Sequence, residues 1–120
     1  MKKALVVDDL SLHRNVIKGA LVSVGFTVDT AADGMEGLQK LRSSAYDVVF
    51  SDIEMPNMNG FEFIARIRRQ ARLKRLPVIM LSTRKDQTTI QRMQQLGANG
   101  YLTKPYSLDN IRKALKLIQH

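Results

Sequence analysis

Residues 3–25 read KALVVDDLSLHRNVIKGALVSVG, and they show the pattern that the rest of the chain repeats. The apolar run from Lys3 to Val7 predicts a short strand. Apolar residues then follow helical spacing from Leu12 to Val24, with Ser11 as the expected cap at the start and Gly25 as the end. This stretch therefore predicts one strand followed by one helix.

The same strand–helix unit recurs four more times before the chain ends. Asp33 and Glu36 have the spacing of a capping box at the start of the second helix. Turn-forming residues at 55–60 separate the third strand from its helix. The remaining strands are expected at 26–30, 46–52, 78–81 and 100–103, and the helices after them carry Leu38, Ile64, Met93 and Ile111 on their apolar faces.

Five strand–helix units predict a doubly wound α/β fold. Continuously apolar strands are typical of a parallel sheet, and right-handed crossovers place helices on both of its faces. A chain of 120 residues, 44% of them hydrophobic, is enough for one core, so we expect a single domain over residues 1–120. In such sheets the ligand site lies beyond the carboxyl ends of the strands, and we expect function there.

The composition excludes several kinds of site. The chain has no cysteine, which excludes disulfides and thiolate ligands, and its two histidines, His13 and His120, are too few for a site built from imidazoles. Any metal is then held by oxygen, which favours Mg2+. No apolar run reaches the roughly 18 residues of a membrane span, and acids appear too early for a secretory signal, so we expect a soluble, cytoplasmic protein.

The net charge of +8 is compatible with nucleic acid or with an acidic protein as partner. Many of the basic residues lie in the run 66–75. The favoured interpretation of this run is a solvated helix face that continues into a loop, and a docking patch is the alternative. Since no recognition helix or aromatic platform accompanies the run, a nucleic-acid partner is disfavoured.

Polar residues follow four of the five expected strands at their carboxyl ends. Each acid taken alone is most simply a helix cap or a turn residue. If the first and third strands are neighbours, however, three carboxylates share one cleft, where a divalent cation relieves their repulsion and nearby donors can bind a phosphoryl group. The polar residues are Asp8 and Asp9 after the first strand, Asp52 after the third, Ser82 and Thr83 after the fourth, and Lys104, followed by Pro105, after the fifth.

Asp52 is the best candidate for a nucleophile that attacks phosphorus. Asp8 and Asp9 share one strand end and suit metal binding, although spacing alone leaves exchanged roles open. Because a carboxylate is a weak nucleophile, acceleration must come from positioning and from neutralisation of the phosphoryl oxygens by the cation and by Lys104.

Four segments in this order resemble the receiver domains of two-component signalling, over essentially the whole chain. The resemblance implies a flavodoxin-like sheet with strand order 2-1-3-4-5, which is the known order of the family's chemotaxis member and is not deduced from these residues. The segments are VVDD (6–9), SDIEMPNMNG (51–60), PVIMLS (77–82) and GANGYLTKPY (97–106).

The resemblance implies how the matching residues handle phosphate and metal. Asp52 would accept a phosphoryl group from a histidine kinase or a histidine phosphotransfer domain, and Lys104 would pair with a phosphoryl oxygen. Asp9 and Asp52 would bind Mg2+, or Mn2+ in its place, directly, and Asp8 would bind it mainly through water. The backbone carbonyl of Glu54 would complete the protein ligands.

The resemblance also implies how a signal leaves the site. Ser82 would bond a second phosphoryl oxygen and move toward it, and Tyr101 would turn inward in response; ordinary packing is the alternative for Tyr101. The altered face, made of the fourth helix, fifth strand and fifth helix, would bind an output protein or a fused domain. The bond between Lys104 and Pro105 would be cis.

Three departures from the family pattern lie around the expected site. Leu10 stands where a polar residue is frequent, and Thr83 stands where a small residue is usual and can narrow access to the phosphoryl group. Glu54 and Arg84 occupy the two variable positions that flank the path of attacking water. We expect an ion pair between them to slow autodephosphorylation.

Two other functions compete with a receiver. A haloacid-dehalogenase-like phosphatase also uses an aspartyl nucleophile and Mg2+, but it carries an aspartate where this chain has Glu54, and it leaves Asp8 and Asp9 unexplained. The second is a binding module built on the basic run at 66–75, with the acids unused. The sequence leaves open whether the chain acts alone or belongs to a larger regulator or hybrid kinase.

Overall fold

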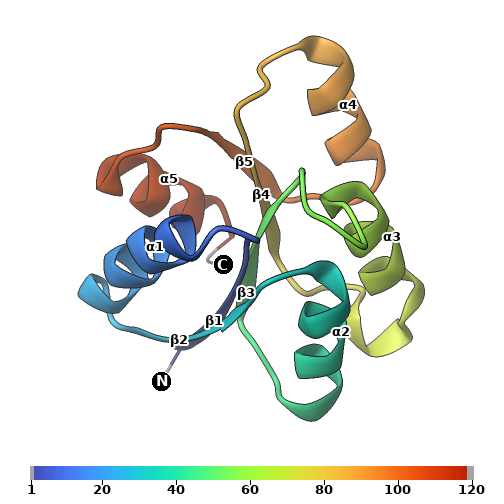
Figure 1. Cartoon of the computed structure of the whole chain (residues 1–120), viewed down its shortest axis with the longest axis horizontal. Helices are drawn as coiled ribbons and strands as arrows, with labels where there is room; N and C mark the ends of the chain where they lie inside the picture. Colours follow the sequence, from blue (N-terminus) through green and yellow to red (C-terminus); the bar gives the residue numbers. More distant parts are fainter. Residues whose placement is uncertain (1, 119–120) are drawn as a thin grey trace.

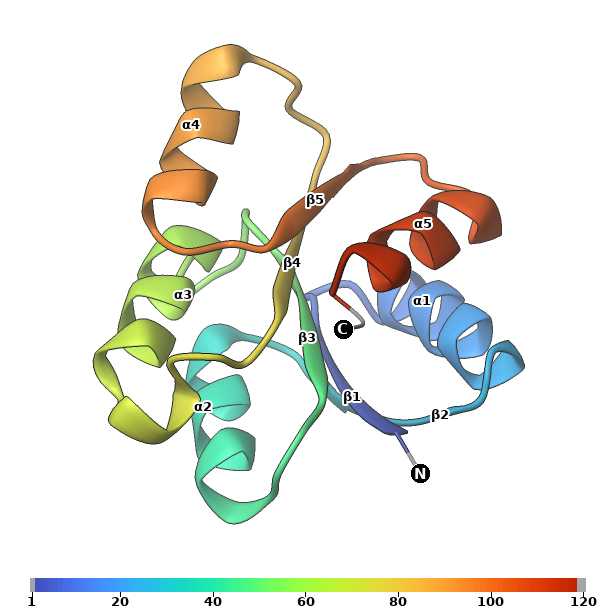
Figure 2. The same ribbon diagram turned by 180° about the vertical axis from the view of Figure 1, so that it is seen from behind.

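The structure, a computed structural model, describes residues 2–118 and holds five parallel strands in the order β2-β1-β3-β4-β5. Helices α1 and α5 cover one face of the sheet, and α2, α3 and α4 cover the other (Figures 1 and 2). The predicted doubly wound fold and strand order are confirmed. The elements are β1 (Lys2–Val7), α1 (Ser11–Ser23), β2 (Phe26–Ala31), α2 (Gly34–Ser43), β3 (Val48–Asp52), α3 (Gly60–Arg69), a 3-10 turn (Ala71–Leu73), β4 (Val78–Ser82), α4 (Gln87–Gln95), β5 (Gly100–Thr103) and α5 (Leu108–Ile118).

Two apolar clusters, one on each face of the sheet, form the core. Every residue of β3 and β4 is buried, as expected for central strands covered on both sides. Phe50 packs with Ile17 and Leu21 under α1 and α5, while Phe63 and Met80 belong to the cluster under α2 and α3. This packing holds the central strands in place, so the backbone at their carboxyl ends is well positioned.

The helix starts follow the sequence prediction in one case and depart from it in another. Asp33 caps α2, and its Oδ1 accepts a hydrogen bond of 2.8 Å from the Glu36 amide. The prediction that Ser11 caps α1 is wrong, because Ser11 is already helical and Leu10 occupies the cap position without a side-chain bond. The Leu10 amide instead donates to Asp8 Oδ1 at 3.0 Å, so the helix start is tied to the strand end.

The basic run at 66–75 is only partly a solvated face. Arg66 is exposed and pairs with Glu62, one turn earlier in α3, at 3.0 Å. Arg68 turns inward and donates to the carbonyl oxygens of Leu73 and Gly97, at 2.9 and 2.8 Å from its two terminal nitrogens. Arg72 donates to the Leu41 carbonyl at 2.7 Å. Arg68 and Arg72 therefore join separate segments of the fold, which the sequence interpretation did not anticipate.

Within residues 2–118, no helix combines the length and the apolar character that crossing a lipid bilayer requires.

Candidate functional site

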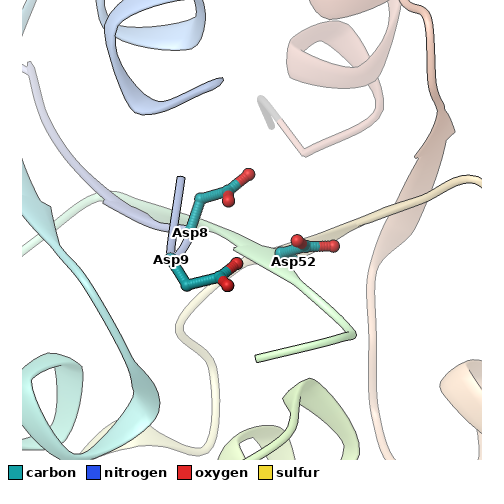
Figure 3. A group of neighbouring side chains, drawn as sticks. All are labelled: Asp8, Asp9 and Asp52. Atoms are coloured by element: carbon teal, nitrogen blue, oxygen red, sulfur yellow. The ribbon is translucent and has the colours of Figure 1, made fainter. Parts of the chain in front are cut away.

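Three carboxylates meet at the carboxyl edge of the sheet, as Figure 3 shows. One oxygen from each of Asp8, Asp9 and Asp52 lies within 4.8 Å of the other two. Asp8 is 1% exposed and Asp52 is 7% exposed, whereas Asp9 is exposed. The predicted convergence of these acids is confirmed, because β1 and β3 are neighbours in the sheet.

The backbone around the acids is held by hydrogen bonds and close packing. The Asp8 amide donates to Ala31 at the end of β2, and the Ile53 amide donates to Leu81 in β4, at 3.1 and 3.2 Å. A Cβ at Gly60 would overlap the carbonyl oxygen of Asp52, so only glycine allows α3 to start this close to the end of β3.

Lys104 completes the acidic cluster with one positive charge. Its Nζ lies 3.2 Å from Asp52 Oδ2 and 3.3 Å from Asp8 Oδ2, and its side chain is 13% exposed. The Lys104 amide donates a hydrogen bond of 2.8 Å to the Ser82 carbonyl. This bond continues the hydrogen-bonded pairing of β4 and β5 up to the site. The bond between Lys104 and Pro105 is cis, as predicted.

Burial raises the pKa of Asp52 above its usual range, because the charged carboxylate is removed from water. The ammonium of Lys104 opposes this shift, and the negative charge of Asp8 adds to it. Asp52 Oδ1 also accepts a hydrogen bond of 2.9 Å from the Ile53 amide, which favours the charged form. The net upward direction means that the folded site holds the Asp52 charge at a cost.

The last residue of β4 and the residue that follows it differ in exposure. Ser82 is 3% exposed, and its hydroxyl oxygen accepts a hydrogen bond of 2.9 Å from the Arg84 amide. Thr83 is exposed and lines a cavity of about 330 Å3 with Lys104 and Tyr106, among others. Ser82 is therefore placed at the strand end, and Thr83 lies with Lys104 at the border of that cavity, while its effect on access to the phosphoryl group stays a prediction.

The aromatic residues near the site occupy two environments. Tyr101 lies on β5, is 39% exposed, and lines a different cavity with Met93 and Leu117. Tyr106 is half-buried, and its pKa is raised by burial and by the negative charges of Asp8 and Asp52. In this structure Tyr101 thus points outward, which is the starting position that an inward switch requires.

The expected ion pair between Glu54 and Arg84 is wrong for this structure. Both residues line a cavity of about 500 Å3 that also contacts Asp9, so they do flank the site. The Arg84 guanidinium, however, pairs with Asp86 at 3.2 Å, two residues further along the chain. Asp86, the N-cap residue of α4, stands in the same loop as Arg84, so its carboxylate is within reach of the guanidinium.

His13 is the site residue that sequence reasoning missed. Its Nδ1 lies 3.3 Å from Lys104 Nζ and 3.5 Å from Asp8 Oδ2. The sequence placed His13 on a helix that follows the Asp8-Asp9 strand end, and that position was the available signal. The sequence argument excluded a site built from imidazoles because the chain has only two histidines. A single imidazole can nevertheless contribute to a site built from other groups.

The comparisons with known proteins agree with this geometry. Over residues 4–116 the sequence matches the family profile of the response regulator receiver domain. The chain belongs to this family. It is 36% identical to the chemotaxis protein CheY of Pseudomonas aeruginosa, over 97% of this chain and 94% of that protein.

Solved receiver structures superpose closely on this one. The chemotaxis protein CheY4 of Vibrio cholerae gives a TM-score of 0.94 at 38% identity and covers 99% of both chains. The response regulator TrrA of Thermotoga maritima, solved in complex with Mg2+ and BeF, gives 0.88 at 33% identity and covers 99% of this chain and 100% of that one. The chain is therefore a receiver domain of two-component signalling.

The acidic cluster of this receiver suits a divalent cation. Asp8, Asp9 and Asp52 carry three negative charges against the one positive charge of Lys104, which leaves an excess of two. The donor atoms are carboxylate oxygens, the ligands that hard cations prefer. The charge and chemistry of the cluster thus match one ion such as Mg2+.

Proposed function

We propose that Asp52 of this receiver accepts a phosphoryl group from a phosphohistidine on a histidine kinase or a histidine phosphotransfer domain. The observation that carries the proposal is the position of the Asp52 carboxylate, which lies 3.2 Å from Lys104 and within 4.8 Å of two further carboxylates at the carboxyl edge of the sheet. In the transfer, a P–O bond to Asp52 forms as the P–N bond to the donor breaks, and the donor imidazole keeps the bonding electron pair.

Lys104 and Ser82 supply positive charge and a hydroxyl donor to the phosphoryl oxygens. Lys104 Nζ already lies 3.2 Å from Asp52, so little motion brings it to a group attached there. The Ser82 side chain is buried at the end of β4, and its hydroxyl oxygen accepts a hydrogen bond from the Arg84 amide. Because Lys104 is in place before the reaction, it stabilises developing charge without a large rearrangement, and Ser82 adds its hydrogen bond as it moves toward the phosphoryl group.

A divalent cation, Mg2+ or Mn2+, would be held by Asp8, Asp9 and Asp52 and by the backbone carbonyl of Glu54. When bound, it neutralises charge on the phosphoryl oxygens. We include these ligands in the proposal because the cluster has two uncompensated negative charges and only oxygen donors.

The same proposal covers how the phosphoryl group is lost and how phosphorylation of Asp52 is passed on to a partner. We assign self-assisted loss of the phosphoryl group to water that enters past Glu54, Thr83 and Arg84, which border the cleft. We assign output to the α4-β5-α5 face, with Ser82 and Tyr101 as the switch, and to a partner protein or a fused domain. A single domain over residues 1–120 and a cytoplasmic location remain predictions.

Phosphotransfer to the intact protein tests the proposal. The chain is incubated with acetyl phosphate and MgCl2, and its intact mass is measured for the wild type and for Asp52→Asn. We expect one added phosphoryl group in the wild type, none in the variant, and none when EDTA replaces the magnesium.

Two results would contradict the proposal. One is a wild type that stays unlabelled at saturating magnesium. The other is continuous release of phosphate from a generic phosphate ester without a phosphorylated protein, which would favour a phosphatase of the haloacid-dehalogenase type.

A further inference from the structure

His13 brings an imidazole to the Lys104 ammonium. It lies in the first turn of α1, and its side chain is 38% exposed. Its Nδ1 lies 3.3 Å from Lys104 Nζ, the same separation as between Nζ and Asp8 Oδ2. A residue on the first helix thus contacts a residue after the last strand, at the centre of the site.

The donors and acceptors around Lys104 balance if Nδ1 is an acceptor. An ammonium has three N–H donors and no acceptor. The oxygens of Asp8 and Asp52 lie within reach of two donors, at 3.3 and 3.2 Å, and His13 Nδ1 lies within reach of the third. A proton on Nδ1 would instead face the ammonium as a second donor, with Asp8 Oδ2, at the longer distance of 3.5 Å, as its acceptor.

We propose that His13 is a positioning residue, whose Nδ1 accepts the third hydrogen bond of Lys104 and holds the ammonium toward Asp52. This inference rests on the proposed function of Asp52. Once Asp52 carries the phosphoryl group, the charged phosphoryl oxygens take the place of its carboxylate charge, and Asp8 and His13 aim the ammonium at them. A neutral acceptor suits this role, because it orients Lys104 without competing with the phosphoryl group through charge.

Two substitutions separate the acceptor from the shape of the side chain. In His13→Asn the amide oxygen occupies the δ position of the imidazole nitrogen and can accept the same bond. In His13→Leu a methyl group occupies that position, and leucine is the better helix former, so α1 should not lose stability. A thermal melt of both variants checks this control.

The first readout needs no phosphodonor. In a 1H–15N spectrum of the histidine rings at about pH 8, where an ordinary imidazole is neutral, we expect the proton on Nε2 of His13. We also expect the Nδ1 resonance to move in Lys104→Met. A proton on Nδ1, or a resonance indifferent to Lys104→Met, would overturn the inference even if Asp52 accepts phosphate.

The second readout is the rate constant for labelling by acetyl phosphate at saturating magnesium. We expect His13→Asn to keep the wild-type rate and His13→Leu to lose about three- to tenfold, as for the loss of one typical hydrogen bond. Equal rates for wild type and His13→Leu, or equal losses in both variants, would overturn the inference. An unlabelled wild type would refute the function of Asp52, while the ring spectrum still decides whether His13 bonds Lys104.

Discussion

At the scale of single residues, the site holds charges at a cost to stability. Asp52 is buried, and its pKa is raised mainly by that burial, despite the ammonium of Lys104. The folded chain therefore binds a proton at Asp52 more tightly than the unfolded chain, whose aspartates have a pKa of about 3.9. The unfavourable contribution of Asp52 is complete above its folded pKa and disappears as the pH falls toward the unfolded value.

Asp52→Asn should therefore stabilise the metal-free protein. We expect the free energy of unfolding at about pH 7 to rise by about 0.5–2 kcal/mol, with a gain that shrinks as the pH falls toward 4. Urea denaturation in EDTA measures both. Asp109→Asn is the control, because Asp109 is exposed in the first turn of α5, and it should give no gain. A destabilised Asp52→Asn would contradict this account of the site.

Glu54 and Arg84 should act independently on the lifetime of the aspartyl phosphate. Arg84 pairs with Asp86 and not with Glu54, so no direct contact couples them here. In a double-mutant cycle of Glu54→Ala and Arg84→Ala, we expect the coupling energy to stay below about 0.5 kcal/mol. The decay of the phosphorylated mass peak gives the four rate constants. A coupling energy above about 1 kcal/mol would contradict this prediction and would indicate that Glu54 and Arg84 form the ion pair suggested by the sequence.

Residue types predicted the acids of the site but not the contacts that long side chains make. Asp8, Asp9 and Asp52 are short and stand at strand ends, so the backbone alone brings them together. Arg84 has many rotamers and takes the nearest carboxylate, which spacing along two different loops does not reveal. His13 reaches the site only because α1 turns one particular face toward Lys104, and a single sequence does not give that angle.

At the scale of secondary structure, the arginines of α3 show how one side chain can join several elements. Arg68 donates to the carbonyl group at the end of the 3-10 turn and to one after α4, and to Asn99 at 3.0 Å. Burial lowers the pKa of its guanidinium. Removal of Arg68 leaves these carbonyl groups without their charged partner.

Arg68→Ala should destabilise the domain, while Arg69→Ala should not. We expect a loss of about 2–3 kcal/mol in the free energy of unfolding for the first, and a change within about 0.5 kcal/mol for its exposed neighbour. Urea denaturation compares the pair under identical conditions. Equal effects of the two substitutions would mean that the hydrogen bonds of Arg68 add nothing beyond a solvated charge.

The strands were easier to predict from sequence than the helix starts. Buried parallel strands appear as short, continuous apolar runs, and the expected runs at 26–30, 78–81 and 100–103 agree with β2, β4 and β5 to within one residue. Capping depends on one hydrogen bond. Asp33 makes the bond that its spacing suggested, but the Asp8 carboxylate takes the Leu10 amide at the start of α1, and Ser11 becomes the first helical residue.

At the scale of the whole molecule, the fold gathers negative charge at one edge of a protein whose net charge is positive. The strand order places the ends of β1 and β3 side by side, with the end of β5 close enough for Lys104 to reach both. Alternation of strands and helices predicted the class of fold. It did not predict the order of the strands, which depends on how the crossovers pack, and that order came from the resemblance.

Calorimetric titration of the intact protein with MgCl2 tests most directly whether this edge is a cation site. We expect one ion per chain for the wild type, an affinity at least about tenfold lower for Asp9→Asn, and no change for Asp47→Asn, which removes a charge before β3 at the opposite edge. Equal affinities for the three proteins would mean that Asp8, Asp9 and Asp52 do not share a cation, and the account of this receiver would fail.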